Sequence, residues 1–333
     1  MQAILTGPDG SGKTTVFDGL RAVLGAKAGR DGRRRLLTLV LGDDERLLAL
    51  SEVEPRPKVT PARYVLADVD AGASEAERIG LWRQADVLVV VLGAFSGEDV
   101  TAARRKFEER LRALDAEVVG KRLGRLREAL ARGGGPHHKR NLTEARLLER
   151  VADALERGEP VRSVEMSSEE RRELAHFALL SAKPCVWLAN TPEESPFDAP
   201  EDFFAVSAAL EAELAEMAED ERAEFAAAYG IESLALRRLP RHIPAAGDRA
   251  IFYTIGKDEI RAWPVPRGLP VREAAGRIHT DFERNFIRAE VVSWEDVAAA
   301  GGWDRAVATG RMSSVGPEHP VSDGDVIYIR AGR

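Results

Sequence analysis

A stretch near the start of the chain, Gly7 to Thr14, has the residue types and spacing to hold the phosphates of a nucleotide. It reads G-P-D-G-S-G-K-T, which fits the phosphate-binding pattern G-x-x-x-x-G-K-[ST]. The glycines let backbone N–H groups point inward at a helix N-terminus, where they bind phosphate oxygens. Lys13 adds a positive charge between the β and γ phosphates, and the Thr14 hydroxyl can bind Mg²⁺. The alternative, a glycine-rich turn before a helix, is disfavoured because all the fixed elements of the pattern are present.

The whole loop and the residue after it are expected to contact the nucleotide. The residues concerned are Asp9, Gly10, Ser11, Gly12, Lys13, Thr14 and Thr15, and Lys13 is also a candidate catalytic residue. A carboxylate at Asp9 is awkward beside phosphates, so we expect it to point away or to hydrogen-bond its own turn.

The elements that must position this loop are a strand before it and a helix after it. Ala3 to Leu5 is a short apolar run, and Thr15 to Leu24 has helical spacing of apolar residues. Further strands alternate with helices, which predicts a parallel sheet with helices on both faces. Because ligands bind such sheets at the carboxyl ends of strands, Asp68, at the end of a predicted strand, is a candidate Mg²⁺ partner. The alternative for Asp68 is a loop or capping aspartate, and nearby Asp70 is a candidate for orienting water.

Composition sets limits on the class of protein. The chain has 333 residues, enough for two or three domains. Its net charge of −7 argues against a protein that coats nucleic acid with its whole surface, so no sequence-specific DNA binding is expected. The single cysteine, Cys185, excludes a disulfide framework and favours a reducing compartment. We find no signal-peptide pattern and no run of about 18 apolar residues, so we expect a cytoplasmic protein without membrane contact.

A helical segment interrupts the alternating pattern. Glu98 to Leu130 is predicted to be one long amphipathic helix, and the Gly133 to Pro136 stretch ends it. Asn141 to Glu144 reads as a capping box that opens a second helix, which predicts an antiparallel hairpin. The residues at its tip are Arg132, His137, His138, Lys139 and Arg140. They could contact an anionic partner such as RNA, or form only a solvated turn; a metal site at the two histidines lacks further ligands nearby.

Two later strands end in polar loops. Pro184 to Ala189 leads into Asn190-Thr191-Pro192-Glu193, and Phe203 to Val206 leads into Ser207-Ala208-Ala209. From Asp248 onward, short strands and one helix near Val271 to His279 predict a small mixed domain.

The N-T-P-E loop and the order of the segments resemble the YchF family of Obg-like ATPases. Nucleotide switches usually read guanine with N-K-x-D, whereas that family uses N-x-x-E and prefers ATP over GTP. The similarity runs almost end to end, and it is especially close over Ala275 to Glu283 and Asn285 to Ala289. Those stretches resemble the family's TGS domain, a β-grasp module linked to RNA and ribosome binding.

The resemblance implies an α/β fold: a P-loop NTPase sheet with an inserted coiled-coil hairpin and a C-terminal β-grasp domain. The nucleotide domain would comprise 1–96 and 175–247, the hairpin 97–174, and the TGS-like domain 248–333. Mg²⁺ would be the cofactor, held by Thr14, Asp68 and Thr38, the last matching the Mg²⁺-sensing threonine of the first switch. The implied base-binding residues are Asn190, Thr191, Glu193, Ser207, Ala208 and Ala209.

The chain also departs from the family pattern. Its phosphate loop differs from the family's G-L-P-N-V-G-K-S, both switches are shortened, and Val90 stands where the family has a histidine. We therefore expect binding of ATP, or GTP, with slow or partner-dependent hydrolysis coupled to the ribosome or RNA. One alternative is a nucleotide-binding adaptor that does not hydrolyse. Another, a small-molecule kinase, is disfavoured because the hairpin would make a poor lid and such kinases lack a β-grasp domain.

Overall fold

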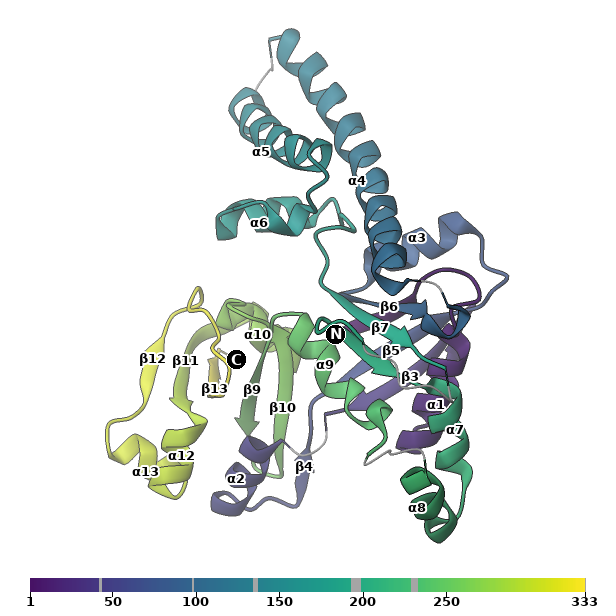
Figure 1. The fold of residues 1–333 in the computed structure, drawn as a ribbon. Coiled ribbons are helices and arrows are strands. Elements are labelled where there is room, and N and C mark those ends of the chain that lie inside the picture. The colour runs from purple at the N-terminus through teal and green to yellow at the C-terminus, as the bar shows by residue number, and fades with distance from the viewer. Residues whose placement is uncertain (42–43, 98, 134–136, 193–198, 229–232, 333) are drawn as a thin grey trace. The chain divides into compact units, whose positions relative to one another are not determined.

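The computed structural model describes residues 1–41, 44–97, 99–133, 137–192, 199–228 and 233–332 (Figure 1). These residues group into two compact units, and each is built from separate stretches of the chain. One unit comprises Gln2–Leu37 and Ala67–Leu239. The other comprises Met1, Thr38–Leu66 and Pro240–Arg333. None of the described helices is long and apolar enough to cross a membrane.

A seven-stranded sheet carries the phosphate loop at the end of its first strand. Its strand order is β2-β3-β5-β1-β6-β7-β8. The bounds are β1 Gln2–Thr6, β2 Ala28–Asp31, β3 Arg34–Val40, β5 Arg63–Val69, β6 Val87–Gly93, β7 Cys185–Asn190 and β8 Phe203–Val206. β1, β6, β7 and β8 run parallel, and β2 and β3 form an antiparallel hairpin. The valine-rich β6 is buried along almost its whole length, as expected for a strand covered on both faces.

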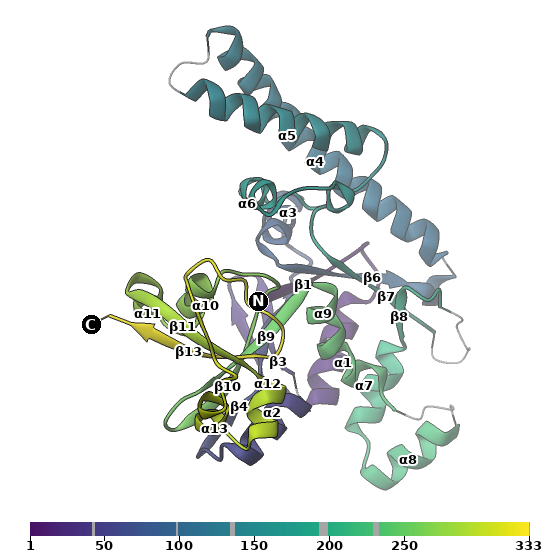
Figure 2. The ribbon, with the colours of Figure 1, turned by 90° about the vertical axis from the view of Figure 1, so that its left-hand side faces the viewer.

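Helices cover the sheet on both sides. They are α1 Lys13–Leu24, α3 Glu75–Gln84 and α7 Ala208–Glu216, and α8, Glu219–Ala228, follows α7 and packs against it. Short 3₁₀ turns lie at Ala94–Ser96, Val161–Ser163 and Ala235–Arg237. On one face Phe107, from the first part of the hairpin, packs between Trp82 of α3 and Trp187 of β7, with ring centroids 5.8 and 6.3 Å away. α1 and α7 lie side by side on the other face (Figures 1 and 2).

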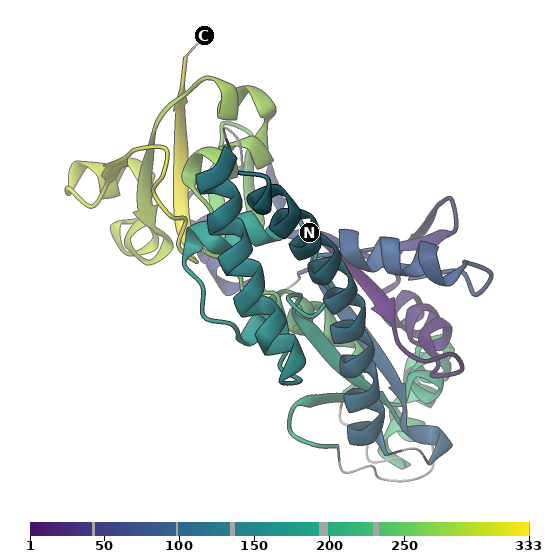
Figure 3. The same cartoon turned by 90° about the horizontal axis from the view of Figure 1, so that it is seen from above.

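The predicted hairpin is present as α4, Val100–Ala131, and α5, His138–Glu156, followed by α6, Ser168–Ala175. The two long helices lie side by side beyond the sheet (Figures 2 and 3). They have an apolar core of their own, in which Val119 and Leu123 pack with Leu148 and Val151.

The second hairpin helix begins earlier than the sequence indicates. It starts at His138, so Asn141 lies inside the helix and cannot cap it. Glu144, expected to complete a capping box, is buried instead and accepts hydrogen bonds from Arg122 Nε and Nη2 at 2.6 and 2.8 Å. The prediction of a capping box there was wrong because this tertiary ion pair takes the carboxylate.

The second unit contains a six-stranded sheet in the order β12-β11-β13-β9-β10-β4. The strands are β4 Lys58–Thr60, β9 Arg249–Ile255, β10 Glu259–Pro266, β11 Phe286–Ser293, β12 Ser313–Val315 and β13 Asp325–Ala331. The helices are α2 Glu45–Val53, α9 Leu239–Ala246, α10 Val271–Ile278, α11 Thr280–Arg284, α12 Trp294–Ala300 and α13 Trp303–Ala308. Val271 and Ala274 of α10 pack on Phe252 and Val265 of the sheet, and these apolar side chains belong to the core of this unit.

An early segment of the chain contributes to this second unit. β4 pairs in parallel with β10, and α2 packs against α12. The Tyr253 hydroxyl donates a hydrogen bond to Asp44 over 2.7 Å, and Glu54 accepts one from the N–H of Trp303 over 2.7 Å. The sequence placed all of 1–96 in the nucleotide domain, whereas Thr38–Leu66 groups with the C-terminal residues.

Candidate nucleotide-binding site

The phosphate loop joins β1 to α1, as its sequence requires. Gly7 has φ +132°, and a Cβ there would lie 2.2 Å from the carbonyl oxygen of Val91. Gly12, at φ +88°, comes so close to Asn190 that a Cβ would lie 2.2 Å from its Nδ2. Only glycine fits both positions, because each combines a left-handed backbone with a close neighbour.

Lys13 curls back over the loop. Its Nζ donates hydrogen bonds to the carbonyls of Gly7, at 3.2 Å, and Pro8, at 2.5 Å. Burial lowers the pKa of this ammonium, and the nearby carboxylates of Asp9 and Asp68 oppose that change. The ammonium therefore spans the concave side of the loop, where phosphate oxygens can compete with the two carbonyls for it.

A pocket opens between the phosphate loop and the loop that follows β5. It is lined by Leu5, Thr6, Gly7, Asp9, Gly10, Gly12, Lys13, Thr14, Asp68, Val69, Asp70, Ala71, Arg78 and Trp82. The structure thus brings together most of the candidate phosphate and metal residues. Thr15, on the first turn of α1, is exposed, and Ser11, within the loop, is buried; neither of them lines the pocket.

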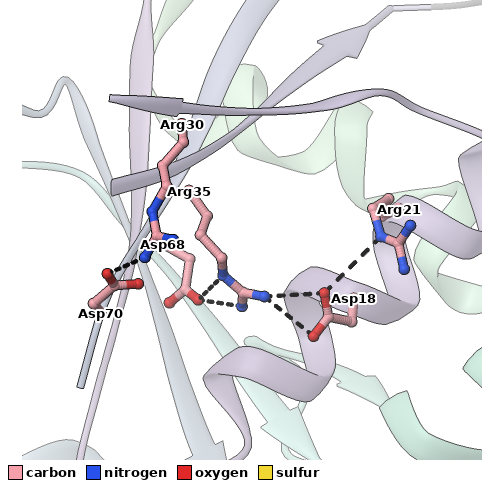
Figure 4. Close-up of polar contacts among 6 residues, drawn as sticks. All are labelled: Asp18, Arg21, Arg30, Arg35, Asp68 and Asp70. Carbon is pink, nitrogen blue, oxygen red and sulfur yellow. Dashed lines mark hydrogen bonds and ion pairs between the residues drawn. The ribbon is translucent and has the colours of Figure 1, made fainter. Parts of the chain in front are cut away.

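Asp68 is held by an arginine that the sequence analysis missed (Figure 4). Arg35 on β3 donates from Nη2 and Nε to Oδ2 of Asp68, at 2.5 and 3.2 Å. Its Nη1 donates to both carboxylate oxygens of Asp18 on α1, and the guanidinium lies 4.5 Å from the ring centroid of Phe17. Burial raises the pKa of Asp68, and Arg35 and Lys13 work against that rise by favouring the charged carboxylate.

Asp70 is also paired with an arginine. The side chain of Arg30, on β2, donates a short hydrogen bond to Oδ2 of Asp70, as Figure 4 shows. The N–H of Asp70 donates to the carbonyl of Arg33 over 2.9 Å. Asp70 therefore lines the pocket, and one of its two carboxylate oxygens is paired with Arg30.

Asp9 points toward a cation and not into its own turn. Its Oδ1 accepts a hydrogen bond from Nη1 of Arg78 over 3.0 Å, and Arg78 itself lines the pocket. Arg78 lies on α3, and its position beside the phosphate loop could not be read from a motif. Neither of the two outcomes expected for Asp9 is seen, because it lines the pocket together with its partner Arg78.

Asn190 connects the phosphate loop to the start of α7. Its Nδ2 donates to the carbonyl of Ser11 over 3.3 Å, and its Oδ1 accepts from the N–H of Ala208 over 3.2 Å. The N-T-P-E loop predicted that Asn190 contacts the base, yet both ends of its amide are used within the protein. Ser207 and Ala208, expected in the loop after β8, lie at the start of α7, and Glu193 lies outside the described residues.

Three buried hydroxyls near the loop lack hydrogen-bond partners among the described residues. They are Oγ1 of Thr6, Oγ of Ser11 and Oγ of Ser207. A buried polar group without a partner is costly, so such groups mark places where a ligand or water is needed.

Thr38 is not brought to this pocket. It lies in the middle of β3 with an exposed side chain, and it groups with the other compact unit. The remaining predicted ligands fit Mg²⁺. Both bonds from Arg35 go to Oδ2 of Asp68, so Oδ1 accepts none within the described part of the chain. A hydroxyl, one carboxylate oxygen and phosphate oxygens make the kind of ligand set that Mg²⁺ takes from proteins. The described residues contain no cluster of three or more histidine, cysteine or acidic side chains suited to another metal.

Comparison with known proteins identifies the family. The chain is 31% identical over 320 residues to the ribosome-binding ATPase YchF of Bacillus subtilis, covering 86% of each protein. This chain belongs to the YchF family. The Haemophilus influenzae member of the YchF family is also 31% identical, over 317 residues. Obg-like ATPase 1 of Oryza sativa subsp. japonica is 31% identical over 312 residues, covering 83% of this chain and 77% of that protein.

The YchF assignment agrees with two further comparisons. Residues 250–332 match the family model YchF-GTPase_C, described as "Protein of unknown function (DUF933)". The solved structure of the Schizosaccharomyces pombe YchF GTPase matches 99% of this chain with a TM-score of 0.74 at 23% identity. The fold expected from the resemblance, a P-loop α/β sheet with a helical hairpin and a C-terminal β-sheet domain, is confirmed.

Proposed function

We propose that this chain binds ATP together with Mg²⁺ in the pocket between the phosphate loop and Asp68. The observation that carries the proposal is that one pocket contains Lys13, Thr14 and Asp68. Lys13 would bind the β and γ phosphates, and Thr14 and Asp68 would hold the metal. Mg²⁺, when bound, neutralises phosphate charge. Arg35 orients the Asp68 carboxylate and favours its charged form against the effect of burial, which suits that role.

Hydrolysis by the chain alone is proposed to be slow. In-line attack requires a group that orients water, and the described lining of the pocket includes no glutamine or histidine. Asp70, the candidate for that role, is paired with Arg30. The guanidinium of Arg30 holds one oxygen of this carboxylate and lowers its ability to orient and activate water, which makes a partner-dependent rate the expected behaviour.

ATP is proposed to bind at least as tightly as GTP. Guanine selection requires a carboxylate that meets two N–H groups of the base together, and Glu193 is longer than the usual aspartate and follows Pro192. Asn190 supports this loop by bridging it to the phosphate loop, so the backbone of the loop would contribute to the reading of adenine. Competition titrations with ATP and GTP test this proposal, and Glu193→Asp should shift preference toward guanine.

The cycle is proposed to operate in the cytoplasm on the ribosome or its RNA. The Bacillus subtilis and Haemophilus influenzae relatives are named ribosome-binding ATPases. The hairpin tip supports such a contact because Arg132, His138 and Lys139 are exposed. The TGS-like domain would form the second contact. Binding should weaken as salt rises, because the release of counterions from phosphates, which favours binding, gains less free energy at high salt. Co-sedimentation with ribosomes across a salt series tests this part.

The deciding experiment is calorimetry with Lys13→Ala. Loss of a charge-assisted contact should weaken ATP binding by about 10- to 100-fold. Arg21→Ala, a change on the surface of α1 away from the pocket lining, serves as the control. Unchanged affinity in Lys13→Ala would refute the site.

A second candidate function is a nucleotide-binding adaptor without hydrolysis, which the engaged state of Asp70 favours. Single-turnover ATP cleavage, measured with and without ribosomes, separates the two. Cleavage that ribosomes stimulate supports the ATPase, and none under either condition supports the adaptor.

A further inference from the structure

Arg78 occupies a position beside the phosphate loop that no motif accounts for. It lies one turn into α3, whose first turn is fixed by a capping box between Ser74 and Glu77. Its Nε donates to the carbonyl of Ala73 over 3.0 Å, and its Nη1 donates to Oδ1 of Asp9 over 3.0 Å. Two anchors from different loops therefore hold the guanidinium in the lining of the pocket.

The third nitrogen of this guanidinium remains available. Within the described residues, Nη2 of Arg78 makes no hydrogen bond, although the group lies in a pocket built for anions. Its charge reaches Lys13 as well, because Arg78 contributes to the lowered pKa of that ammonium. Asp9 is the carboxylate near both cations, but among the described residues it bonds only Arg78, and Lys13 donates to the carbonyls of Gly7 and Pro8. A phosphate bound in this pocket would therefore meet two cations.

The site has two distinguishable ends. Asn190 approaches the phosphate loop at Ser11 and Gly12 and also accepts a hydrogen bond from the N–H of Ala208. This marks the side of the two loops expected to contact the base. The pocket lining extends instead toward Asp68 and Arg78. A nucleotide carries its base and its terminal phosphate at opposite ends, and Lys13 marks the β and γ phosphates between them. The terminal phosphate thus belongs at the end where Arg78 lies.

We propose that Arg78 binds the terminal phosphate of the nucleoside triphosphate and so distinguishes triphosphate from diphosphate. This inference rests on the proposed function of the pocket. A guanidinium suits the role because its planar donors match phosphate oxygens, and an arginine from the same chain can stabilise charge during phosphoryl transfer. Asp9 holds Arg78 before the nucleotide arrives. The side chain of Asp9 is 83% exposed, so it can turn to solvent when phosphate replaces it.

The test compares affinities for ADP and for a non-hydrolysable ATP analogue, both with Mg²⁺, by calorimetry. Arg78→Ala should weaken binding of the analogue about tenfold or more while ADP changes less than about twofold, because only the analogue has the third phosphate. Arg78→Lys should give an intermediate loss, since it keeps the charge but not the fork. Asp9→Asn should strengthen analogue binding, because it removes a carboxylate that competes for Arg78 and repels phosphate. Arg21→Ala should match the native protein.

The outcomes separate this proposal from the function on which it rests. Equal losses for ADP and the analogue in Arg78→Ala would overturn the terminal-phosphate assignment while leaving the nucleotide site intact. Unchanged affinity for both nucleotides would show that Arg78 only holds Asp9 in place, and it would also overturn the proposal. Native protein that binds neither nucleotide would refute the proposed function itself. Thermal unfolding of each variant checks that α3 is still folded, and the lysine variant keeps the comparison decisive if the alanine variant is unstable.

Discussion

Arg35 and Asp68 face each other on neighbouring strands, with Nη2 of the arginine 2.5 Å from Oδ2 of the aspartate. The same guanidinium reaches Asp18 on α1 at 3.1 Å. One side chain on β3 therefore links the helix that follows the phosphate loop to the strand that carries the candidate metal ligand (Figure 4). This arrangement fixes the spacing between the two loops that form the pocket.

Removing this link should destabilise the protein. In Arg35→Ala the carboxylate of Asp68, which is 4% exposed, loses its hydrogen-bonded cation. We expect the free energy of unfolding to fall by about 2 kcal/mol, the scale of hydrogen bonds to charged groups. Urea unfolding followed by circular dichroism measures it. Arg21→Ala removes only an exposed pair at 4.0 Å and should cost less than about 0.5 kcal/mol. Equal stability of the two variants would contradict the prediction.

Asn190 should matter through both ends of its amide. Asn190→Ala removes the bonds to Ser11 and Ala208, so we expect a loss of about 2 kcal/mol in unfolding free energy, about 1 kcal/mol for each bond. Asn190→Asp keeps the acceptor but places a carboxylate oxygen against the carbonyl of Ser11, so it should be at least as damaging. Chemical unfolding of both variants is the measurement. An aspartate variant as stable as the native protein would show that the bridge to the loop contributes nothing.

Asp115 supports the base of the hairpin from the middle of α4. It is fully buried and accepts hydrogen bonds from the N–H groups of Leu180, at 2.8 Å, and Ser181, at 2.6 Å. Asp115→Ala leaves two buried donors unpaired, which should cost about 2–5 kcal/mol. Hydrogen exchange at those two amides should accelerate together with the loss of stability. Asp115→Asn retains one acceptor oxygen, so its stability should lie between those of the native protein and the alanine variant. Slow hydrogen exchange at both amides in the alanine variant would argue against this role.

Cys185 should report unfolding through its reactivity. Burial raises the pKa of its thiol to about 11, from an ordinary value near 8.5. The folded protein therefore holds the thiol proton more tightly, and the free energy of unfolding should fall as pH rises through this window. At pH 8 an aromatic disulfide reagent should label the folded chain about a hundredfold or more slowly than the urea-unfolded chain. The Cys185→Ser variant, which has no thiol, measures the background reaction of the reagent. Fast stoichiometric labelling without denaturant would contradict this expectation.

Local signals in the sequence were enough for the phosphate loop and most strands. Gly7 to Thr14 is read from contiguous residues, and the glycine requirement at Gly7 and Gly12 follows from backbone geometry and close neighbours. The helix predicted near Val271 to His279 lies within one residue of its observed bounds, Val271–Ile278. Such elements depend mainly on periodicity, which is a property of neighbouring residues.

Side-chain partners from distant parts of the chain could not be read in the same way. The sequence marks Asp9, Asp68 and Asp70 as acids near phosphate, but their cations come from β2, β3 and α3. Glu144 likewise matches a capping pattern in the sequence, but in the structure its carboxylate is paired with Arg122. In each case an ion pair formed by the tertiary fold decides the role of a residue whose local pattern allows several.

The six-stranded sheet is assembled from two parts of the chain that are separated by about half its length. During synthesis, Lys58–Thr60 and the buried face of α2, with Leu47 and Leu50, leave the ribosome long before β10 and α12 exist. At ~5–20 residues per second this wait is on the order of ten seconds or more. This early segment must remain unpaired, or be covered by another protein, while the rest of the chain is synthesised. Completion of the six-stranded sheet is therefore a late folding step, in which a segment made early pairs with strands made last. A protein truncated before Pro240 would keep the early segment with its apolar residues exposed.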